Sequence, residues 1–354
     1  MATRRTQHQQ KQNQQGRGNT TVAALAVVAI VISGFAIIMS FFSLSAAYMS
    51  LKQVQAGGGS AATTTVSSSS GSFGSTTANI DVPLNSTELS VINNASNSYF
   101  ETAGLMLLNG TLPNQVFDNV VPVAPYVANG KPSVVYLGSI TCIYCGENRW
   151  AMALALGRFG SFSNLYKGYS SFSDYDVPTL YWTQNNYTTS DSNVYNGNGI
   201  AIGNSYSSKY INFFSIEGNG KITQGFFIQP LNIIQQEVNA TGNKTYIGAY
   251  SYLMGMQGSN STAFKGTPYT VWGANVVLGA DGVVFGNTAP TNSTLPLTYM
   301  THAGVLSQLK NPSNGFAWSE YAAADVYVAH VCGAINNTAP ICSLSAIRQI
   351  EALK

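Results

Sequence analysis

The sequence predicts an α/β domain that follows one transmembrane helix. Three observations lead to this expectation: an uncharged apolar run near the N-terminus, strand patterns in the middle of the chain, and helical patterns around them. Charged residues make up 8% of the 354 residues, against about 25% in an ordinary soluble domain, and hydrophobic residues make up 45%. The chain can therefore build a large core, and its surface must be polar but mostly uncharged.

Residues 20–50 contain no charged side chain and form the predicted membrane anchor. A helix rises about 1.5 Å per residue, so about 20 apolar residues cross a bilayer core of about 30 Å. Four basic residues precede the run and one follows it closely: Arg4, Arg5, Lys11 and Arg17, then Lys52. The positive-inside rule then keeps residues 1–19 in the cytoplasm and places the main domain outside the cell. The alternative is a signal peptide cleaved near Ser45-Ala46-Ala47, although apolar regions of such peptides usually have about 7–15 residues.

Residues 51–79 are rich in Gly, Ser and Thr, which predicts a flexible linker between the anchor and a folded domain over residues 80–354. Asn-x-Ser/Thr triplets recur after the anchor, a pattern that favours an exported glycoprotein. Nine such triplets begin at Asn85, Asn94, Asn109, Asn186, Asn239, Asn243, Asn260, Asn292 and Asn336.

Within the folded part, apolar periodicity predicts helices and short strands in a definite order. Helices are expected over residues 87–108, 147–156, 233–256 (broken near 239–243), 299–310, 317–331 and 343–353. Strands are expected over 132–138, 179–182, 210–216, 268–272, 275–278 and 283–285, with a loop between the second and third. This is the order of elements in a thioredoxin-like α/β domain, here with helical and loop insertions and a C-terminal helical extension.

The strongest chemical signal is the Cys142-x-x-Cys145 pair, which lies where a strand pattern gives way to a helix pattern. Thiol–disulfide exchange needs a thiolate, an exposed first sulfur and a second thiol close enough to resolve the mixed disulfide. A helix N-terminus stabilises an anion at the first cysteine and places the second one turn behind it. We therefore take Cys142 as the candidate attacking cysteine and Cys145 as the candidate resolving cysteine.

Thr267-Pro268 is the candidate substrate-binding segment, because it begins a predicted strand far downstream of the cysteine pair. Thioredoxin-like proteins have a cis-proline at this point, packed against the active-site disulfide, and the preceding residue offers backbone groups to an extended substrate. Cis peptide bonds are essentially a proline feature. The plainer alternative is an ordinary trans proline at the start of a strand.

Three blocks of this sequence resemble the archaeal domain of unknown function family 929. They are residues 134–160 with their Cys-x-Tyr-Cys motif, residues 205–217, and the segment from Cys332 to Cys342 with its Pro340. The likeness covers about residues 130–350 and implies a membrane-anchored archaeal protein of thioredoxin-like fold, without a known activity. The chain departs from the family at two positions, with Ile143 in place of the usual Pro and Asn148 in place of a frequent acid. Glu147, beside Asn148, could take over proton transfer to the resolving thiol.

Cys332 and Cys342 are predicted to lie at facing helix ends and to form a structural disulfide, because exported cysteines usually pair. A second redox pair that relays electrons to the first is the alternative. The two cysteine pairs are far apart and the three histidines, His8, His302 and His330, are scattered, so the spacing of a zinc finger or ribbon is missing and a zinc site is not expected. The sequence gives no sign of any other metal or cofactor.

The sequence supports two hypotheses about function. In the first, the protein is a thiol–disulfide oxidoreductase or isomerase that acts on exported cysteine-containing proteins and is re-oxidised by a quinone-linked membrane partner. In the second, it is a non-catalytic cell-surface glycoprotein or binding domain with structural disulfides. Its net charge is +2 and it has no basic patch with interleaved aromatics, so nucleic-acid binding is not expected. The lipid bilayer is a partner through residues 20–50.

Overall fold

The computed structural model describes residues 80–112, 121–122, 124–140, 142–170, 177–184, 200–218, 242, 244–249, 275–286, 297–298, 300–313 and 315–353. They belong to one compact unit, residues 71–354, of α/β class, as the sequence predicts. The expected anchor at 20–50, the linker at 51–79 and Thr267-Pro268 lie outside the described residues. None of the described helices is both long and apolar enough for a bilayer crossing.

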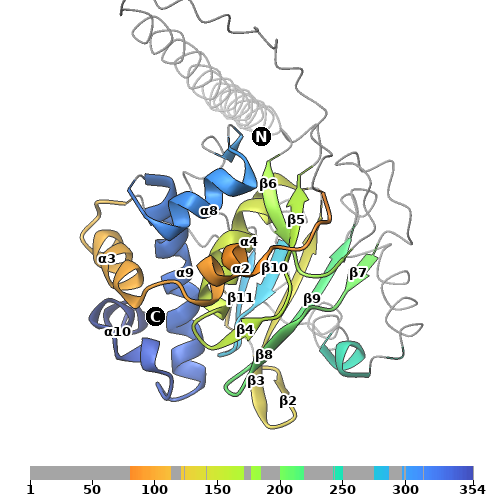
Figure 1. The fold of residues 1–354 in the computed structure, drawn as a ribbon. Helices are drawn as coiled ribbons and strands as arrows, with labels where there is room; N and C mark the ends of the chain where they lie inside the picture. Colours follow the sequence, from red (N-terminus) through yellow and green to blue (C-terminus); the bar gives the residue numbers. More distant parts are fainter. Residues whose placement is uncertain are drawn as a thin grey trace, which may run out of the picture. The chain divides into compact units, whose positions relative to one another are not determined.

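A mixed sheet forms the centre of the described domain (Figure 1). Its order is β1 (Val121–Pro122), β11 (Val283–Gly286), β10 (Asn275–Leu278), β3 (Lys131–Ser139), β9 (Asn212–Gly218) and β7 (Ile200–Ile202), and β2 (Val127–Ala128) pairs with the start of β3. The central strand β3 is parallel to β9 and antiparallel to β10. A parallel pair needs a crossover connection, and the chain between β3 and β9 begins with the helix α4 (Ile143–Leu156).

Side chains alternate between the two faces of this sheet. On one face, Tyr136 of β3 and Glu217 of β9 both contact Arg149 of α4. On the other face, the Phe214 ring lies 6.0 Å from Tyr126 and 5.2 Å from Tyr246, measured between ring centroids. Tyr246 belongs to a helical segment over residues 244–249, inside the broken helix that the sequence predicts. The sheet is therefore covered on both faces.

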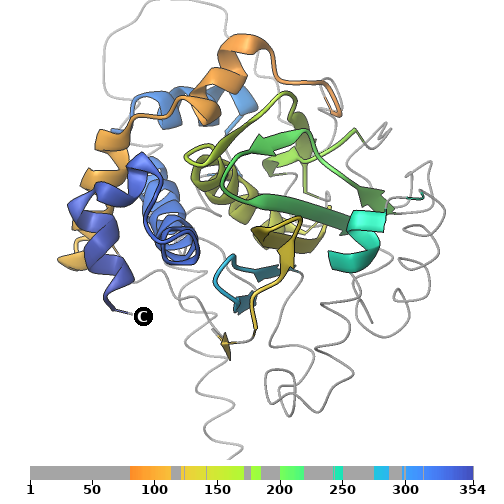
Figure 2. The ribbon, with the colours of Figure 1, turned by 90° about the horizontal axis from the view of Figure 1, so that it is seen from below.

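Helices build a second layer beyond α4. The long helix α9 (Gly315–Ala334) packs against α4 and also against α3 (Asn97–Leu108) and α10 (Ser345–Glu351) (Figure 2). Both α4 and α9 are buried along most of their length, which suits helices that are apolar nearly all round. The remaining helices, α2 (Ser86–Asn93) and α8 (His302–Lys310), contact each other, and α2 also contacts α4 while α8 also contacts α9.

The single helix predicted over residues 87–108 is wrong, because the structure has two helices there. Asn85 caps α2 in a capping box with Glu88, and the Ser96 hydroxyl accepts a hydrogen bond from the Ser98 amide to start α3. Between the two helices, the Arg158 guanidinium donates to three backbone carbonyls, those of residues 92, 93 and 95. The two local caps and the long-range bonds of Arg158 together outweigh the continuous apolar pattern.

The loop predicted between the second and third strands is wrong in part. It contains β7 and β8 (Tyr206–Ser208), and β8 pairs with another unpredicted strand, β4 (Gly160–Phe162). β5 (Tyr166–Tyr169) is also unpredicted and pairs with β6 (Pro178–Tyr181). These strands are three or four residues long, too short to show a clear alternation; β4, β5 and β8 are rich in Tyr, Ser and Gly, and β7 is Ile-Ala-Ile. Pairing across long sequence distances, rather than local pattern, makes them strands.

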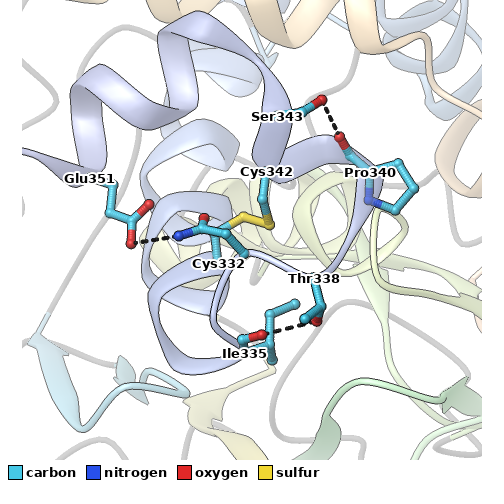
Figure 3. Close-up of a disulfide and its surroundings, with 8 residues drawn as sticks. Cys332, Ile335, Thr338, Pro340, Cys342, Ser343 and Glu351 are labelled. Carbon is cyan, nitrogen blue, oxygen red and sulfur yellow. Dashed lines mark hydrogen bonds between the residues drawn. A yellow bond between two sulfur atoms is a disulfide. The ribbon is translucent and has the colours of Figure 1, made fainter.

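A disulfide joins Cys332, in the last turn of α9, to Cys342, in the short 3-10 helix η5 (Pro340–Ser343) (Figure 3). The predicted pairing is confirmed. Hydrogen bonds tighten the loop that it closes: the Thr338 hydroxyl donates to the Ile335 carbonyl at 2.9 Å, and the Ser343 hydroxyl donates to the Pro340 carbonyl at 2.8 Å. Both cysteines have no exposed surface. This burial supports a structural role, because electron relay needs an accessible sulfur.

Replacing Cys332 and Cys342 together by alanine should lower the free energy of unfolding by about 2–3 kcal/mol, the chain-entropy value for a loop of this length. Urea denaturation of the parent and the double variant measures the difference. Adding a reductant should lower the free energy of unfolding of the parent to that of the variant and should not change that of the variant. Equal stability of parent and variant without reductant would contradict a stabilising disulfide.

Asp325 is a fully buried carboxyl in the middle of α9, and neither of its oxygens has a hydrogen-bond partner among the described residues. Burial raises its pKa well above the ordinary value of 3.8, and the neighbouring Glu101 raises it further. A Cβ added at Gly104 of α3 would lie 3.0 Å from its Oδ2 atom, so the packing there is tight. The folded protein therefore favours the neutral acid.

Asp325→Asn should remove the part of the pH dependence of stability that the buried carboxyl causes. A raised folded-state pKa gives stability that is complete below pH 3.8 and is lost as pH rises through the folded pKa. The free energy of unfolding of the variant should thus rise relative to that of the parent as pH increases. Denaturation from pH 4 to pH 8 measures this difference. His302 acts in the opposite sense, since burial lowers its pKa to about 4, but it is shared by both proteins and cancels in the difference. A difference that does not vary with pH would contradict the assignment.

Candidate functional site

The cysteine pair lies at the start of α4, as the sequence predicts. Cys142 is the N-cap residue with extended backbone angles, and its carbonyl accepts the first helical hydrogen bond from the Gly146 amide at 3.0 Å. Cys145 follows in the first turn. Both are present as thiols. Cys142 is 8% exposed and Cys145 is 0% exposed, so the first cysteine is the more accessible of the two, but only slightly.

The first turn of α4 also presents an exposed aromatic side chain. Tyr144, between the two cysteines, is 48% exposed, whereas its neighbour Ile143 is buried. Ile143 belongs to the main hydrophobic core. The turn that carries the thiols is thus fixed by packing on one side and open at Tyr144 on the other.

Beneath this turn lies a fully buried ion pair between Arg149 of α4 and Glu217 of β9. The Arg149 Nε atom donates to the Glu217 Oε1 atom at 2.6 Å, and the two side chains are 0% and 1% exposed. Burial alone would lower the pKa of the guanidinium, but the charge of Glu217 raises it above its ordinary value, so Arg149 is charged. Burial raises the pKa of the Glu217 carboxyl, and Arg149 offsets part of that rise.

The Tyr136 hydroxyl completes this buried group. It has no hydrogen-bond partner among the described residues, and the Arg149 guanidinium lies 5.9 Å from the centre of its ring. Burial raises its pKa well above the ordinary value of 10.0. Four neighbouring groups also act on it, of which Arg149 lowers the pKa and three raise it: Cys145, Glu217 and Cys142. Both thiols therefore lie within electrostatic range of the phenol.

Gly138 makes room for this phenol. It is two residues beyond Tyr136 on the same face of β3, and a Cβ there would collide with the Tyr136 ring and hydroxyl. In the sheet register Gly138 is opposite Glu217. The absence of a side chain at 138 thus lets the Tyr136 hydroxyl extend toward the end of the strand that leads to Cys142.

Thr179 of β6 holds the helix from the other side. Its hydroxyl donates to the Gly146 carbonyl at 2.7 Å and accepts a 3.4 Å hydrogen bond from the Arg149 Nη1 atom. Gly146 permits this approach, because its Cβ position is 3.3 Å from the Thr179 Cβ. One turn later, the Trp150 indole donates to the Pro178 carbonyl at 3.1 Å. The helix start is therefore attached to two separate sheets.

Glu147 and Asn148 are neighbours in α4, but their surroundings differ. Glu147 is fully buried in α4, two residues after Cys145. Asn148 accepts a 2.8 Å hydrogen bond from the Tyr327 hydroxyl of α9 through its Oδ1 atom. The amide thus joins α4 to α9. The role of Glu147 in proton transfer stays a prediction.

Two expected site residues are not brought to the cysteine pair, since Thr267 and Pro268 lie outside the described residues. The cis peptide bond predicted at Pro268 also stays a prediction. In the parts of the chain that the structure describes, no cluster of three or more His, Cys, Asp or Glu side chains could hold a metal ion.

Sequence reasoning gave no role to Tyr136, Arg149 and Glu217. Arg149 and Glu217 do lie in blocks that resemble the family, and a usable signal was present. In a chain with so few charges, a charged residue inside an apolar helix and another at the end of an apolar strand indicate a buried ion pair.

The comparisons with known proteins fix the family. A model of the domain of unknown function 929 (DUF929) matches residues 119–332, more than half of the chain. The chain belongs to the DUF929 family. No curated protein and no solved structure gives a match. The matched DUF929 segment contains β3, α4, β9, β10, β11 and most of α9, together with Cys142 and Cys145.

Proposed function

We propose that this DUF929 protein is a membrane-anchored thiol–disulfide oxidoreductase or isomerase that acts outside the cell on exported cysteine-containing proteins. The observation that carries the proposal is the position of Cys142 and Cys145 in the first turn of α4, directly after the central strand β3 and above a buried cation. A helix N-terminus and a nearby guanidinium both favour a thiolate.

A thioredoxin-like fold is part of this proposal. Its support is the strand order β9-β3-β10-β11, in which β9 is parallel to β3 while β10 and β11 alternate in direction. The crossover helix α4 starts with the cysteine pair, and the predicted Thr267-Pro268 segment precedes β10 in the chain. In such a fold, that segment would hold the substrate strand beside Cys142.

In the oxidising direction, a substrate thiolate attacks Cys142 in the Cys142–Cys145 disulfide, and Cys145 leaves as a thiolate. A second substrate thiol then attacks the mixed disulfide, so the substrate gains a disulfide and the protein keeps two thiols and two electrons. A quinone-linked membrane protein is the proposed acceptor for these electrons. Arg149 favours this direction, because a stabilised thiolate makes the corresponding disulfide a stronger oxidant. The exposed Tyr144 would contact the substrate.

Trapping of mixed disulfides tests the proposal. The full chain with Cys145→Ala, produced in its native cells, should accumulate adducts between Cys142 and exported proteins, because the Cys142 thiolate can still attack a client disulfide but no Cys145 thiol is present to release the client. Non-reducing electrophoresis followed by mass spectrometry identifies them. The matched control is Cys142→Ala, which removes the attacking sulfur and should give none. Absence of adducts with both variants would refute the exchange activity.

A non-catalytic cell-surface glycoprotein is the second candidate. One observation favours it: Cys142 keeps only 8% of its surface exposed. In that case the cysteine pair would be structural, and neither variant would trap a partner.

A further inference from the structure

A cleft of about 490 Å³, lined by both polar and apolar side chains, lies between α2, the start of α3 and the end of α8. This volume is within the range of about 300–1,000 Å³ that is common for small-molecule sites. Its polar lining is mostly uncharged and rich in hydroxyls: Ser86, Thr87, Ser90, Ser96 and Tyr99, with Lys310 at one side. Such a lining suits a neutral, polyhydroxylated ligand, that is, a sugar.

Asn94 also lines this cleft, and it is the first residue of an Asn-Ala-Ser glycosylation triplet. Its side chain is exposed, and the Nδ2 atom donates to the Ser90 hydroxyl at 3.0 Å. The atom that would carry a glycan therefore faces the hydroxyl-bearing side of α2. A sugar attached to it would begin within reach of the cleft.

The corner that carries Asn94 is held firmly. Arg158 donates to the carbonyls of Asn93 at 2.8 Å and Ile92 at 3.1 Å, and also to that of Ala95. Ala95, the middle residue of the triplet, is buried. The backbone on both sides of Asn94 is thus fixed by the fold. A transferase that needs an accessible triplet must act before this corner closes.

We propose that Asn94 carries an N-linked glycan whose first sugars lie in this cleft. The donor would be an oligosaccharide activated on a polyprenyl phosphate. The Asn94 Nδ2 atom forms a bond to the anomeric carbon, the bond from that carbon to the phosphate oxygen breaks, the lipid phosphate leaves, and one amide proton is released. The inference rests on the exported location proposed above and is independent of the thiol chemistry.

Asn109 provides a matched site on the same part of the chain. It also begins a triplet, is exposed, and ends the helix α3 as Asn94 ends α2. Its Oδ1 atom accepts a hydrogen bond from the Thr111 amide at 3.1 Å, and a Cβ at the next residue, Gly110, would meet no atom within 4 Å. Asn109 does not line the cleft, so a glycan there would extend into solvent.

The test compares Asn94→Gln and Asn109→Gln with the parent, all as full chains from the native cells and from a host without N-glycosylation. Mass spectrometry of peptides should show a sugar mass at Asn94 in the parent and in Ser96→Thr, which keeps both the triplet and the helix cap. In the glycosylating cells, Asn94→Gln should lower the melting temperature by about 2–4 °C more than in the other host. Asn109→Gln should change the melting temperature by the same amount in both hosts.

The host comparison separates the glycan from the side chain, because the Asn94 hydrogen bond to Ser90 is lost in both hosts. An unmodified Asn94 in the parent would overturn the proposal. So would an Asn94→Gln effect of the same size in both hosts, which would mean that the sugars do not contact the cleft. Neither result would bear on trapping by Cys142, so this test and the test of exchange activity can fail separately.

Discussion

Replacing Arg149 by methionine is expected to lower the free energy of unfolding by about 3–5 kcal/mol, the usual cost of removing one partner from a buried ion pair. The substitution leaves the Glu217 carboxyl buried without its 2.6 Å partner and removes the positive charge next to Tyr136. Urea denaturation at pH 7, followed by tryptophan fluorescence, measures the loss. The reduction potential of the cysteine pair should also fall, since the thiolate loses a stabilising charge.

The double variant Arg149→Met/Glu217→Met provides the control. Replacing both partners by apolar side chains of similar length removes the stranded charge, so the double variant should regain most of the stability lost by the single one. Its reduction potential should stay low, because the cation is still absent. A loss below about 1 kcal/mol in Arg149→Met would mean that the pair is not buried as described.

Alkylation of the reduced protein should modify Cys142 about 100-fold faster than Cys145. Cys142 has 8% of its surface exposed, whereas Cys145 has none and can react only after local opening of the first turn of α4. An opening free energy of about 3 kcal/mol, typical of a local fluctuation, gives a factor of this size. Timed treatment with iodoacetamide and mass spectrometry of the peptides yields the two rates.

The buried disulfide provides an internal reference for this experiment. Cys332 and Cys342 should remain unmodified until the protein is unfolded and reduced. Similar rates for Cys142 and Cys145 would show that the two thiols are not ordered as attacking and resolving groups. The hypothesis that Cys142 and Cys145 have only a structural role in a non-catalytic domain would then be preferred.

The sequence predicts the central elements well, for a physical reason. The strands β3, β9, β10 and β11 contain short apolar blocks, and apolar residues predominate in α4 and α9. Burial on both sides produces such patterns, so they can be read locally. A turn joins the two strands expected over residues 275–278 and 283–285: Gly282 has a φ of 85°, and the Gly279 amide donates to the Val283 carbonyl at 2.7 Å.

The contacts that the sequence did not predict join residues that are far apart in the chain. Arg149 and Glu217 are 68 residues apart, and nothing local indicates that they meet. The strands β4 and β8 form only through pairing with each other across more than forty residues. The cysteine pair itself was found because its chemistry needs a short, local spacing. The ion pair and the phenol near it come from three elements, α4, β9 and β3, that only the fold brings together.

The attachment of α2, α3 and α10 to the core has a practical consequence. The family match ends at residue 332, yet α10 packs on α3 and α9, and the disulfide partner of Cys332 lies ten residues further on. A shortened chain cut at the limits of the match would lack Cys342 and the backbone carbonyls that bind Arg158. Recombinant work on this domain should therefore begin near residue 80 and keep the C-terminus.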